Sequence, residues 1–483
     1  MMRVLVTGAT GFIGRALVMR LLGGGHHVAA WVRDDARARD LLGREVELVS
    51  ARSSVSDAIA RADAVVNLAG ESVFGGRWTE ARKKALTASR VDLTRSIAAA
   101  IEASPTRPSV FVSASAVGFY GDCGDAIVED DGAAGDDFLA RLCRNWESAA
   151  MGAAGAGTRV FIPRIGIVLG VGGGALATMS VPFRLGVGGP IGTGRQYVPW
   201  IHIEDLIEII VKALSDPRLS GAMIAAAPNP VTNLELSKAI AARLHRPCFA
   251  RVPAALLKLA LGEAASMLLG GQRARPTRLE RSGFSWRYPA IDAALDDIFG
   301  NDRPRISRLT DEMPAPRIES DYFRSRRPRY VLVHKTRVDA PIERVFDFFS
   351  RPANLGAMTP ARMQFQIVEG ADADVRRGLR IRYRLRIGPL PVRWTTLIEE
   401  WEPPVFFADS QQSGPYRSWW HEHHFAPDGN GTLMEDRVYY SPLAGPMAGI
   451  VNAAMIAPML SEIFAFRAKM IKLRFGRPVT NSS

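Results

Sequence analysis

Short apolar runs alternate with amphipathic stretches through the first 300 residues. The clearest apolar runs lie at 4–6, 27–32, 63–70 and 109–121. Unbroken runs of this length are typical of parallel strands that are buried on both faces. Helical periodicity is seen in residues 15–22 and again in residues 79–102. This alternation predicts an α/β domain with a doubly wound parallel sheet over residues 1–300.

The pattern changes after residue 300. Residues 301–327 are rich in proline, arginine and aspartate without an apolar period, so we expect an extended linker. Residues 328–483 then alternate as strands, with one helix near their start and a long helix near their end. The expected strands are 330–338, 364–369, 378–387, 393–401, 406–411, 419–425 and 432–440, and the expected helices are 342–349 and 447–473. This order predicts a separate α+β domain in which antiparallel strands form a cup around the long helix.

Composition narrows the classes of function. The 483 residues carry 61 Lys and Arg against 49 Asp and Glu, a net charge of +12. Because the basic residues are scattered and no nucleic-acid module accompanies them, a nucleic-acid partner is not expected. The alternating segment 379–387 places four arginines on one strand face, which favours a solvent-facing surface over a site for an anionic partner.

Targeting and redox signals are absent from the pattern. The N-terminus enters a strand directly, and no uninterrupted apolar run is long enough to span a bilayer. The best candidate, residues 254–269, is interrupted by Lys258 and Glu263 and is expected to be a buried amphipathic helix. Three widely spaced cysteines indicate neither a disulfide framework nor a metal cluster. We therefore expect a cytoplasmic protein without an integral membrane segment.

The first strand leads into a glycine-rich loop and a helix. Gly8 suits a tight turn, Gly11 suits close approach of backbone to a pyrophosphate, and Gly14 suits close packing of helix on sheet. Free N–H groups at the helix start then face the phosphates. This Rossmann-type arrangement predicts dinucleotide binding. The candidate residues of the loop are Gly8, Thr10, Gly11, Phe12, Ile13 and Gly14.

The end of the second strand selects the dinucleotide. A carboxylate there would bind the ribose hydroxyls and repel a 2′-phosphate, but this chain has Val32 followed by Arg33. An arginine can pair with a 2′-phosphate. NADP is therefore expected in preference to NAD, although Arg33 can also be read as a solvated strand end.

Further candidates follow the ends of later strands, where open α/β sheets bind their ligands. Ser115 and Tyr120 are the candidate catalytic residues, since a hydroxyl at a strand end can hydrogen-bond a substrate; Tyr120 can also be read as a packed aromatic. The remaining candidate cofactor-binding residues are Leu68, Ala69, Gly70, Ser113 and Pro163.

Several motifs together resemble a known family. TGATGFIG, VVNLAG, SASAVGFYG, PRIGIVLG and GTGRQYVPWIHIEDL, in this order, resemble an extended short-chain dehydrogenase/reductase, the class that contains sugar-nucleotide epimerases. LAGESV, GRW, SRVDLT, FLARLCRNWE, GGGALATM, PNPVTNLEL and GFSWRYP resemble the epimerase-family proteins of bacteria and plastids, some of which are labelled cell-division inhibitors. The resemblance covers residues 1–300 and implies an NADP-dependent oxidoreductase or epimerase.

One departure from that class affects its chemistry. Extended reductases carry a Tyr-x-x-x-Lys pair, in which the tyrosine is the acid/base and the lysine lowers its pKa. Aligning on Glu147 places Leu139 in the tyrosine position and Cys143 in the lysine position. Redox chemistry would then need a substitute, for which the candidates are Tyr120, Tyr197 and His202. Asp205 is read as a helix cap rather than a catalyst.

The second domain also resembles a known superfamily. VDAPIERVFDFF and GPYRSWWHEHHF resemble the helix-grip superfamily, which includes START-type lipid carriers and polyketide cyclases, over residues 328–475. This implies a cavity for a hydrophobic ligand. Its expected lining residues are Trp394, Phe406, Trp420 and Met434.

The histidines of this domain do not predict a metal site. Alternation places His421 and His423 on one strand face, next to His424, but no carboxylate or cysteine pattern in the sequence completes a ligand set. Structural or solvent-facing histidines are favoured, and no metal is expected.

Two functions remain open. The chain is either an NADP-dependent oxidoreductase or epimerase acting on an unknown small molecule, or a non-catalytic nucleotide-sensing or scaffold protein in which the missing pair of residues means no turnover.

Overall fold

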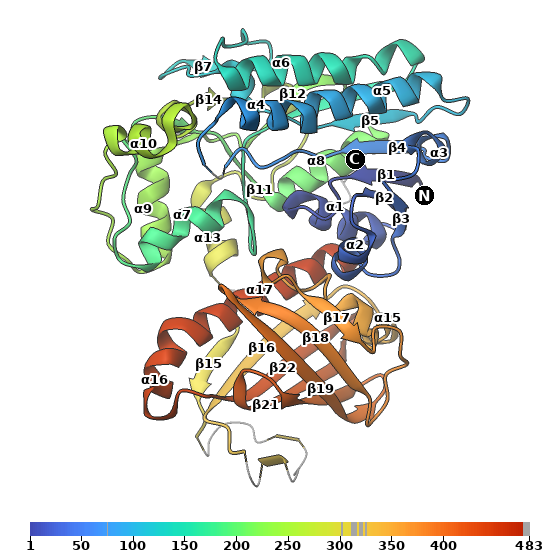
Figure 1. Ribbon diagram of the computed structural model, residues 1–483, viewed down its shortest axis with the longest axis vertical. Helices are drawn as coiled ribbons and strands as arrows, with labels where there is room; N and C mark the ends of the chain where they lie inside the picture. The colour runs from blue at the N-terminus through green and yellow to red at the C-terminus, as the bar shows by residue number, and fades with distance from the viewer. Residues whose placement is uncertain (75, 301–302, 311–315, 318–321, 324–325, 477–483) are drawn as a thin grey trace. The chain divides into compact units, whose positions relative to one another are not determined.

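The structure is a computed structural model that describes residues 1–74, 76–300, 303–310, 316–317, 322–323 and 326–476. The chain divides into two compact units (Figure 1). The first comprises residues 1–21, 25–33 and 46–301, and the second comprises residues 22–24, 34–45 and 302–483.

The first unit is built on a parallel sheet with the strand order β12-β8-β5-β4-β1-β2-β3, and β6 pairs with β8 beyond the end of β5. The strands are β1 (Arg3–Thr7), β2 (His27–Val32), β3 (Glu47–Ser50), β4 (Ala64–Asn67), β5 (Val110–Ser113), β6 (Ser115–Ala116), β8 (Arg159–Ile165) and β12 (Gly221–Ala225). The order reverses direction between β1 and β4. This confirms the expected doubly wound sheet and places its ligand crevice at the carboxyl ends of those two strands.

Helices cover both faces of this sheet, and three short strand pairs lie outside it (Figure 1). The helices are α1 (Phe12–Gly23), α3 (Val55–Ala60), α4 (Glu80–Thr87), α5 (Leu93–Ala103), α6 (Phe138–Met151), α7 (Gly174–Arg184), α8 (Ile203–Ser215), α9 (Asn233–Arg243), α10 (Ala254–Leu261), α11 (Ser266–Leu269), α12 (Thr277–Arg281) and α13 (Ile291–Phe299). The pairs are β7 (Ile127–Val128) with β14 (Arg273–Ala274), β9 (Ile167–Leu169) with β11 (Trp200–His202), and β10 (Tyr197–Val198) with β13 (Val231–Thr232). Helix α2 (Asp35–Leu42) belongs to a stretch grouped with the second unit.

Two helix expectations need correction. The single helix expected over 79–102 is two α-helices, α4 and α5, joined by a π-helical turn at Ala88–Asp92. The segment expected to be a buried helix over 254–269 begins with α10, in which Leu256 is 57% and Leu259 is 70% exposed. Apolar periodicity shows which side of a helix is apolar, but burial requires a second element packed on that side.

The second unit contains an antiparallel sheet in the order β15-β16-β22-β21-β20-β19-β18-β17. The strands are β15 (Arg305–Arg308), β16 (Tyr330–Val338), β17 (Gln366–Glu369), β18 (Arg380–Ile387), β19 (Leu390–Glu402), β20 (Phe406–Ser413), β21 (Tyr416–Asp428) and β22 (Gly431–Pro442). The helices are α15 (Ile342–Phe349), α16 (Ala448–Val451) and α17 (Ala457–Phe475). This confirms the expected α+β fold, with α17 packed on one face of the sheet.

Both faces of the second sheet are apolar. Trp394 packs with Leu460 and Phe464 of α17 on the inner face. Phe406 and Trp420 pack on the outer face, so the expectation that they line a cavity under α17 is wrong. Alternation on β22 puts Met434 on the inner face. When both faces are apolar, alternation separates the two sets of side chains but does not show which set meets the helix.

The outer face is covered by part of the expected linker. Strand β15 pairs with β16, and Tyr322 and Phe323 pack against Trp420. The backbone N–H of Trp419 donates to the Tyr322 hydroxyl at 2.8 Å, and the Arg317 N–H donates to Glu422 Oε1 at 2.8 Å. The described residues between 303 and 326 are therefore partly a strand and partly a covering segment, because their few aromatic residues fill an apolar sheet face.

The structure excludes one of the two sequence interpretations of the β21 histidines, that of solvent-facing side chains, for His421 and His423. His421 stands opposite Asp409 of β20, and His423 stands opposite Asp436 of β22. Both histidine side chains are buried, so they do not face solvent, and two carboxylates accompany them. The sequence could not show this because cross-strand neighbours depend on the register of the sheet.

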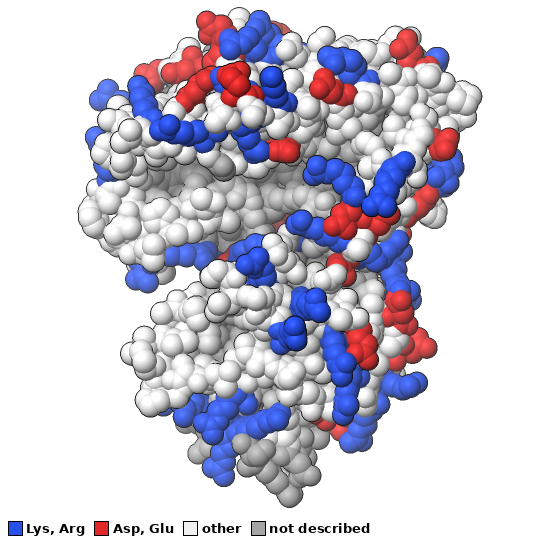
Figure 2. Space-filling view, viewed as in Figure 1, with Lys and Arg blue, Asp and Glu red and all other residues white. Residues whose placement is uncertain are grey.

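Charged side chains lie on the surface of both units, and one helical run of the second unit is strongly apolar. The four arginines of β18 are exposed, as in a solvent-facing surface, and basic and acidic side chains are interspersed on the side of each unit that Figure 2 shows. The helical run Gly445–Phe475 is long and apolar enough to cross a membrane by length and composition, with 33% of its most apolar window buried. The sequence analysis singled out residues 254–269 instead of this run, and the core helix of a protein without a membrane span passes the same test.

Candidate dinucleotide site

The glycine-rich loop has the close contacts that its sequence predicts. A Cβ on Gly14 would lie 2.2 Å from the carbonyl oxygen of Gly8, so α1 can approach β1 only because this residue is glycine. Gly8 has φ +69°, and a Cβ there would lie 2.6 Å from the Leu68 carbonyl. A Cβ on Gly11 would have one neighbour within 4 Å, the Gly8 oxygen at 3.2 Å. The side of the loop at Gly11 is therefore open among the described residues, as binding of a pyrophosphate requires.

The residues around Gly11 remain accessible. Gly11 is exposed, and Thr10, Phe12 and Ile13 are half-buried. The Phe12 ring packs on a second glycine-rich segment, where a Cβ on Gly173 would lie 2.5 Å from the ring. The Gly11 N–H donates to the Gly8 carbonyl at 3.0 Å, so the loop is closed by its own hydrogen bond while Phe12 packs on the second segment.

A buried polar network holds the carboxyl ends of the central strands together. The Thr7 hydroxyl donates to Asn67 Oδ1 at 2.6 Å, and Asn67 Nδ2 donates to Thr94 Oγ1 at 2.8 Å. The Trp146 indole N–H donates to the same Thr94 hydroxyl at 2.9 Å. Ser113 Oγ lies 3.5 Å from Asn67 Nδ2 and is fully buried, which makes Ser113 a structural residue of this network.

The turn after β4 leads to a residue that the sequence analysis missed. Leu68 and Ala69 are half-buried and Gly70 is exposed, with the Arg90 guanidinium directly beside Gly70. Arg90 lies on the π-helical turn, donates to the Glu71 carbonyl at 2.7 Å and is placed over the Trp146 ring. Burial lowers the pKa of Arg90. Arg90 lies in the SRVDLT motif, but the sequence spacing of that motif does not reveal the π-helical turn. Such turns are frequent at functional sites.

The two candidate catalytic hydroxyls lie in a second buried network. Ser115 donates to Glu147 Oε1 at 2.7 Å, and the Arg164 guanidinium binds both oxygens of Glu147 at 2.9 and 2.8 Å. Arg164 also donates to the Tyr120 hydroxyl at 2.8 Å, and that hydroxyl donates to the Asp130 carbonyl at 3.2 Å. The structure therefore brings Ser115 and Tyr120 together through Glu147 and Arg164.

These contacts limit what the hydroxyls can do. Burial raises the pKa of Tyr120 to about 12 despite the neighbouring Arg164. Cys143, in the position where reductases have lysine, is buried in hydrogen-bond contact with Ser115, and burial raises the pKa of its thiol to about 12. Cys143 therefore cannot replace the reductase lysine, whose positive charge lowers the pKa of the catalytic tyrosine. The environment of Tyr120 matches its interpretation as a packed, hydrogen-bonded aromatic.

Pro163 and Arg33 occupy different environments. Pro163 is buried within β8 and stands beside the break between β5 and β6, where its missing N–H removes a ladder hydrogen bond. Arg33 is exposed at the end of β2. Val32 pairs with Ser50 of β3, and the exposed Arg52 follows that strand. Two cations thus follow neighbouring strand ends, and sequence analysis identified only the first.

The other proposed substitutes have structural contacts. His202 caps α8, with Nδ1 accepting the Glu204 N–H at 3.2 Å and Nε2 3.1 Å from Asp297. Asp205 is therefore not the cap; its carboxylate accepts the N–H groups of Arg287 and Tyr288 at 2.8 and 3.0 Å. Tyr197 is half-buried under the Arg273 guanidinium. None of these residues is described in contact with Ser115.

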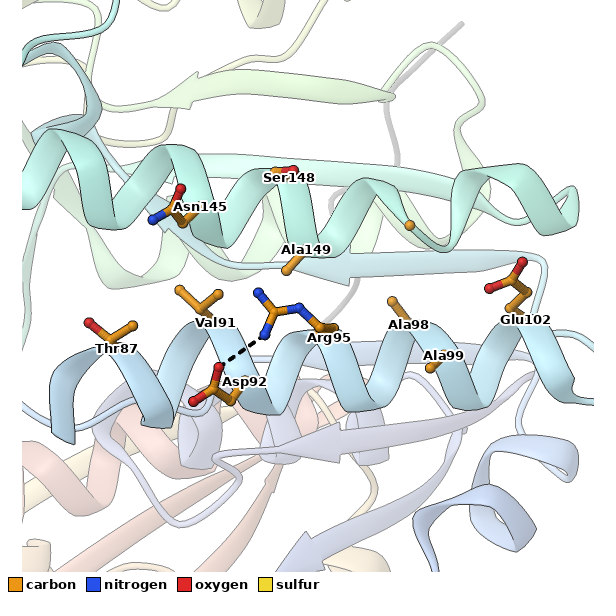
Figure 3. A pocket seen from close by; sticks show the side chains of 11 residues that line it. Thr87, Val91, Asp92, Arg95, Ala98, Ala99, Glu102, Asn145, Ser148 and Ala149 are labelled. Atoms are coloured by element: carbon orange, nitrogen blue, oxygen red, sulfur yellow. Dashed lines mark hydrogen bonds and ion pairs between the residues drawn. The ribbon is translucent and has the colours of Figure 1, made fainter. Parts of the chain in front are cut away.

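A separate groove of about 510 Å³ runs between α5 and α6 (Figure 3). Its lining comes from α5, α6, the π-helical turn before α5 and the last residue of α4, and Asp92 pairs with Arg95 at 3.1 Å within it. The lining residues are Thr87, Val91, Asp92, Arg95, Ala98, Ala99, Glu102, Asn145, Ser148, Ala149 and Gly152. They do not include the glycine-rich loop, so this groove is distinct from the candidate dinucleotide site.

Comparison with known proteins assigns the first unit. Residues 4–224 match the NAD dependent epimerase/dehydratase family, and residues 252–298 match a domain of unknown function. The epimerase family protein SDR39U1 of Bos taurus is 39% identical over 302 residues, which are 62% of this chain and 99% of that protein. This chain belongs to the epimerase family. A chloroplastic homologue from Arabidopsis thaliana is also 39% identical, over 62% of this chain and 86% of the plant protein.

Solved structures agree with this assignment. The human epimerase family protein SDR39U1, crystallised with NADPH, has a TM-score of 0.56 and 38% identity, over 62% of this epimerase-family chain and 99% of that one. A nucleoside-diphosphate sugar epimerase from Corynebacterium glutamicum has a TM-score of 0.51 and 35% identity, over 62% of this chain and 58% of that one. Residues 331–476 match the family described as polyketide cyclase / dehydrase and lipid transport, which confirms the expected relationship of the second unit.

Proposed function

We propose that the first unit binds NADP(H) at the carboxyl ends of β1 and β4. The open side of the loop at Gly11 carries this proposal, because a Cβ would occupy the space that a pyrophosphate needs. The half-buried residues around Gly11 offer the N–H groups at the start of α1 to the phosphates. The human relative that was crystallised with NADPH supports the choice of ligand.

The strand ends beside the loop favour NADP(H) over NAD(H). Val32 offers no carboxylate to the ribose hydroxyls, and Arg33 and Arg52 are exposed at neighbouring strand ends. A 2′-phosphate carries negative charge that guanidinium groups bind by charged hydrogen bonds. We assign Arg33 as the main contact and Arg52 as the second.

The chemistry proposed for this site is that of an oxidoreductase or epimerase acting on a small molecule. Bound NADP(H) supplies hydride transfer. The chain itself supplies the crevice, the hydrogen bond between Thr7 and Asn67 that joins the ends of β1 and β4, and the Arg90 guanidinium beside Gly70. It does not supply the Tyr-x-x-x-Lys proton relay, so a reaction here takes its proton from a different group than in most extended reductases.

One observation favours a second function, nucleotide sensing without turnover. The hydroxyls of Ser115 and Tyr120 both point into the Glu147 and Arg164 network, and the thiol at Cys143 is buried. A site with no accessible proton donor would hold NADP(H) as a structural or regulatory ligand. The two functions differ in one measurable property, which is whether the bound cofactor changes its redox state.

For the second unit we propose binding of an apolar or amphipathic small molecule. The inner face combines aromatic residues such as Trp394 and Trp419 with a few buried polar groups, a composition typical of ligand sites. The match to a family described by lipid transport supports this class of ligand. A cytoplasmic location is part of the same proposal.

Titration of the purified chain with NADPH, NADP, NADH and NAD tests the first proposal. NADPH is expected to bind at least about tenfold more tightly than NADH, and Arg33→Ala should weaken NADPH binding by about 1.5 to 3 kcal/mol, the scale of a charged hydrogen bond. NADH binding should not change in this variant. Equal affinity of the unmodified chain for NADPH and NADH would contradict the assignment of Arg33.

A second experiment separates turnover from sensing. The chain is loaded with NADPH, and absorbance at the reduced nicotinamide band is followed while UDP-sugars and small carbonyl compounds are added. Oxidation of the cofactor that is lost in Gly11→Val supports the enzyme. A cofactor that stays reduced with every compound, while its affinity responds to them, supports sensing.

A further inference from the structure

The strongest unassigned cluster lies on the inner face of the second sheet. Asp409 Oδ2 is 3.7 Å from His421 Nδ1 and 3.4 Å from His423 Nε2. The three ligand atoms all lie within 4.8 Å of one another. Donor atoms bound to one tetrahedral metal at about 2.0 to 2.2 Å are roughly 3.3 to 3.6 Å apart. The two oxygen-to-nitrogen distances are therefore close to those of a common coordination sphere.

A second carboxylate holds the far side of both imidazole rings. Asp436 Oδ1 is 3.1 Å from His421 Nε2 and 2.9 Å from His423 Nδ1. Asp436 Oδ1 accepts the Nε2–H of His421, which leaves His421 Nδ1 unprotonated and facing Asp409. His423 Nδ1 lies close to the same oxygen but makes no hydrogen bond among the described residues, and His423 Nε2 faces Asp409. Metal-binding histidines are commonly oriented in this way by a carboxylate behind them.

The charges of the cluster leave room for a cation. Asp436 is fully buried and the Asp409 side chain is 14% exposed, while the nearest guanidinium, Arg467 of α17, lies 3.7 Å from Asp436 Oδ1. With neutral imidazoles, the two carboxylates and the Arg467 guanidinium together carry one net negative charge. Asp436 Oδ2 is buried without a hydrogen-bond partner among the described residues. Buried carboxylates are stable only when they are paired or bind a metal.

Aromatic side chains pack against both histidines of the cluster. The Phe407 ring stacks on His423 with centroids 4.0 Å apart, and Phe464 of α17 contacts His421. His424, the next residue along β21, packs instead with Phe406 on the outer face and bonds Glu422. The strand therefore offers a matched control histidine that is outside the cluster.

We propose that Asp409, His421 and His423 bind one divalent transition-metal ion, with Asp436 orienting the two imidazoles. Two histidines and one carboxylate leave coordination positions open, as in catalytic zinc sites and in non-haem iron sites. These positions lie on the side of the sheet that α17 covers. The ion would present a Lewis-acidic centre to an oxygen-bearing group of a ligand bound there. This proposal does not depend on dinucleotide binding by the first unit.

The test uses the full chain, stripped with a chelator and dialysed. Zn²⁺ binding is measured by calorimetry and by elemental analysis, and Co²⁺ is added separately because its visible absorption reports imidazole coordination. The variants are Asp409→Asn, His423→Asn and Asp436→Asn, with His424→Asn as the control. Asp297→Asn is included because His202, Glu204 and Asp297 form a second group with metal-ligand spacing.

We expect one equivalent of Zn²⁺ in the unmodified chain, in His424→Asn and in Asp297→Asn, and loss of binding in Asp409→Asn and His423→Asn. Asp436→Asn should weaken binding by about 10- to 100-fold, the usual effect of removing a group behind the ligands. Circular dichroism checks that each variant is folded. Absence of Zn²⁺ binding, unchanged binding in folded Asp409→Asn, or loss only in Asp297→Asn would overturn the proposal.

Discussion

Gly11 and Gly14 offer a matched test of the glycine-rich loop, because the structure predicts opposite outcomes for the same substitution. A Cβ on Gly14 would lie 2.2 Å from the Gly8 oxygen and 2.8 Å from Ala9 Cα, both backbone atoms. A Cβ on Gly11 would meet only the Gly8 oxygen within 4 Å, at 3.2 Å. Gly14→Ala should therefore disturb the fold, whereas Gly11→Ala should disturb only the ligand.

The magnitudes follow from these distances. Real Cβ contacts are essentially never shorter than 3.0 Å, so Gly14→Ala must push α1 away from β1. Overpacking of this kind costs about 1 to 3 kcal/mol. For a domain of this size that is a fall in melting temperature of roughly 2 to 12 °C. Gly11→Ala needs a shift of only a few tenths of an ångström and should change stability by less than about 0.5 kcal/mol.

The assay is thermal unfolding with and without NADPH, together with calorimetric titration. A ligand at 100 times its dissociation constant stabilises a protein by about 2.7 kcal/mol. We expect Gly11→Ala to melt like the unmodified chain without NADPH and to lose at least about half of the stabilisation with it. Its affinity should fall at least about tenfold, which corresponds to 1.4 kcal/mol. A Gly11→Ala variant with full NADPH stabilisation would refute the assignment of this loop, and an unchanged melt of Gly14→Ala would refute the packing argument.

Three further predictions concern buried groups and the covering segment. Glu147→Ala leaves Arg164 buried without its carboxylate and should lower the free energy of unfolding by about 3 to 5 kcal/mol, measured by urea unfolding; a loss below 1 kcal/mol would contradict a buried pair. Burial raises the pKa of Cys143 to about 12, so the folded state keeps the thiol protonated where the unfolded chain loses its proton. Stability should then fall as the pH rises from 9 towards 12, and Cys143→Ala should flatten that fall; an unchanged slope in the variant would count against this origin. A fragment of residues 303–483 should melt at a higher temperature than one of 328–483, because the shorter fragment exposes the outer face of the sheet; equal melting temperatures would show that the segment adds no stability.

Local pattern was enough to determine several features of this protein. The alternation of apolar runs with helical stretches was enough to predict the parallel sheet, because strands that are buried on both faces appear in the sequence as continuous apolar runs. The spacing of Gly8, Gly11 and Gly14 indicated the loop, because Gly11 and Gly14 have their close contacts within a few residues along the chain and Gly8 adopts a positive φ. The substitution of the reductase pair by Leu139 and Cys143 was equally visible. These features depend on neighbours in sequence.

Tertiary structure decided what depends on partners far apart in sequence. Tyr120 and Ser115 are committed to Arg164 and Glu147, from β8 and α6, and no local pattern marks such a network. Phe406 and Trp420 could not be placed on a face, since both faces of their sheet are apolar.

The histidines of β21 show the same limit most clearly. Their alternation was visible, but the carboxylates that accompany them come from β20 and β22, and strand register places those carboxylates opposite the rings. Sequence periodicity determines which side of an element a residue occupies. Only the folded chain determines what meets that side, because that depends on how distant elements pack together.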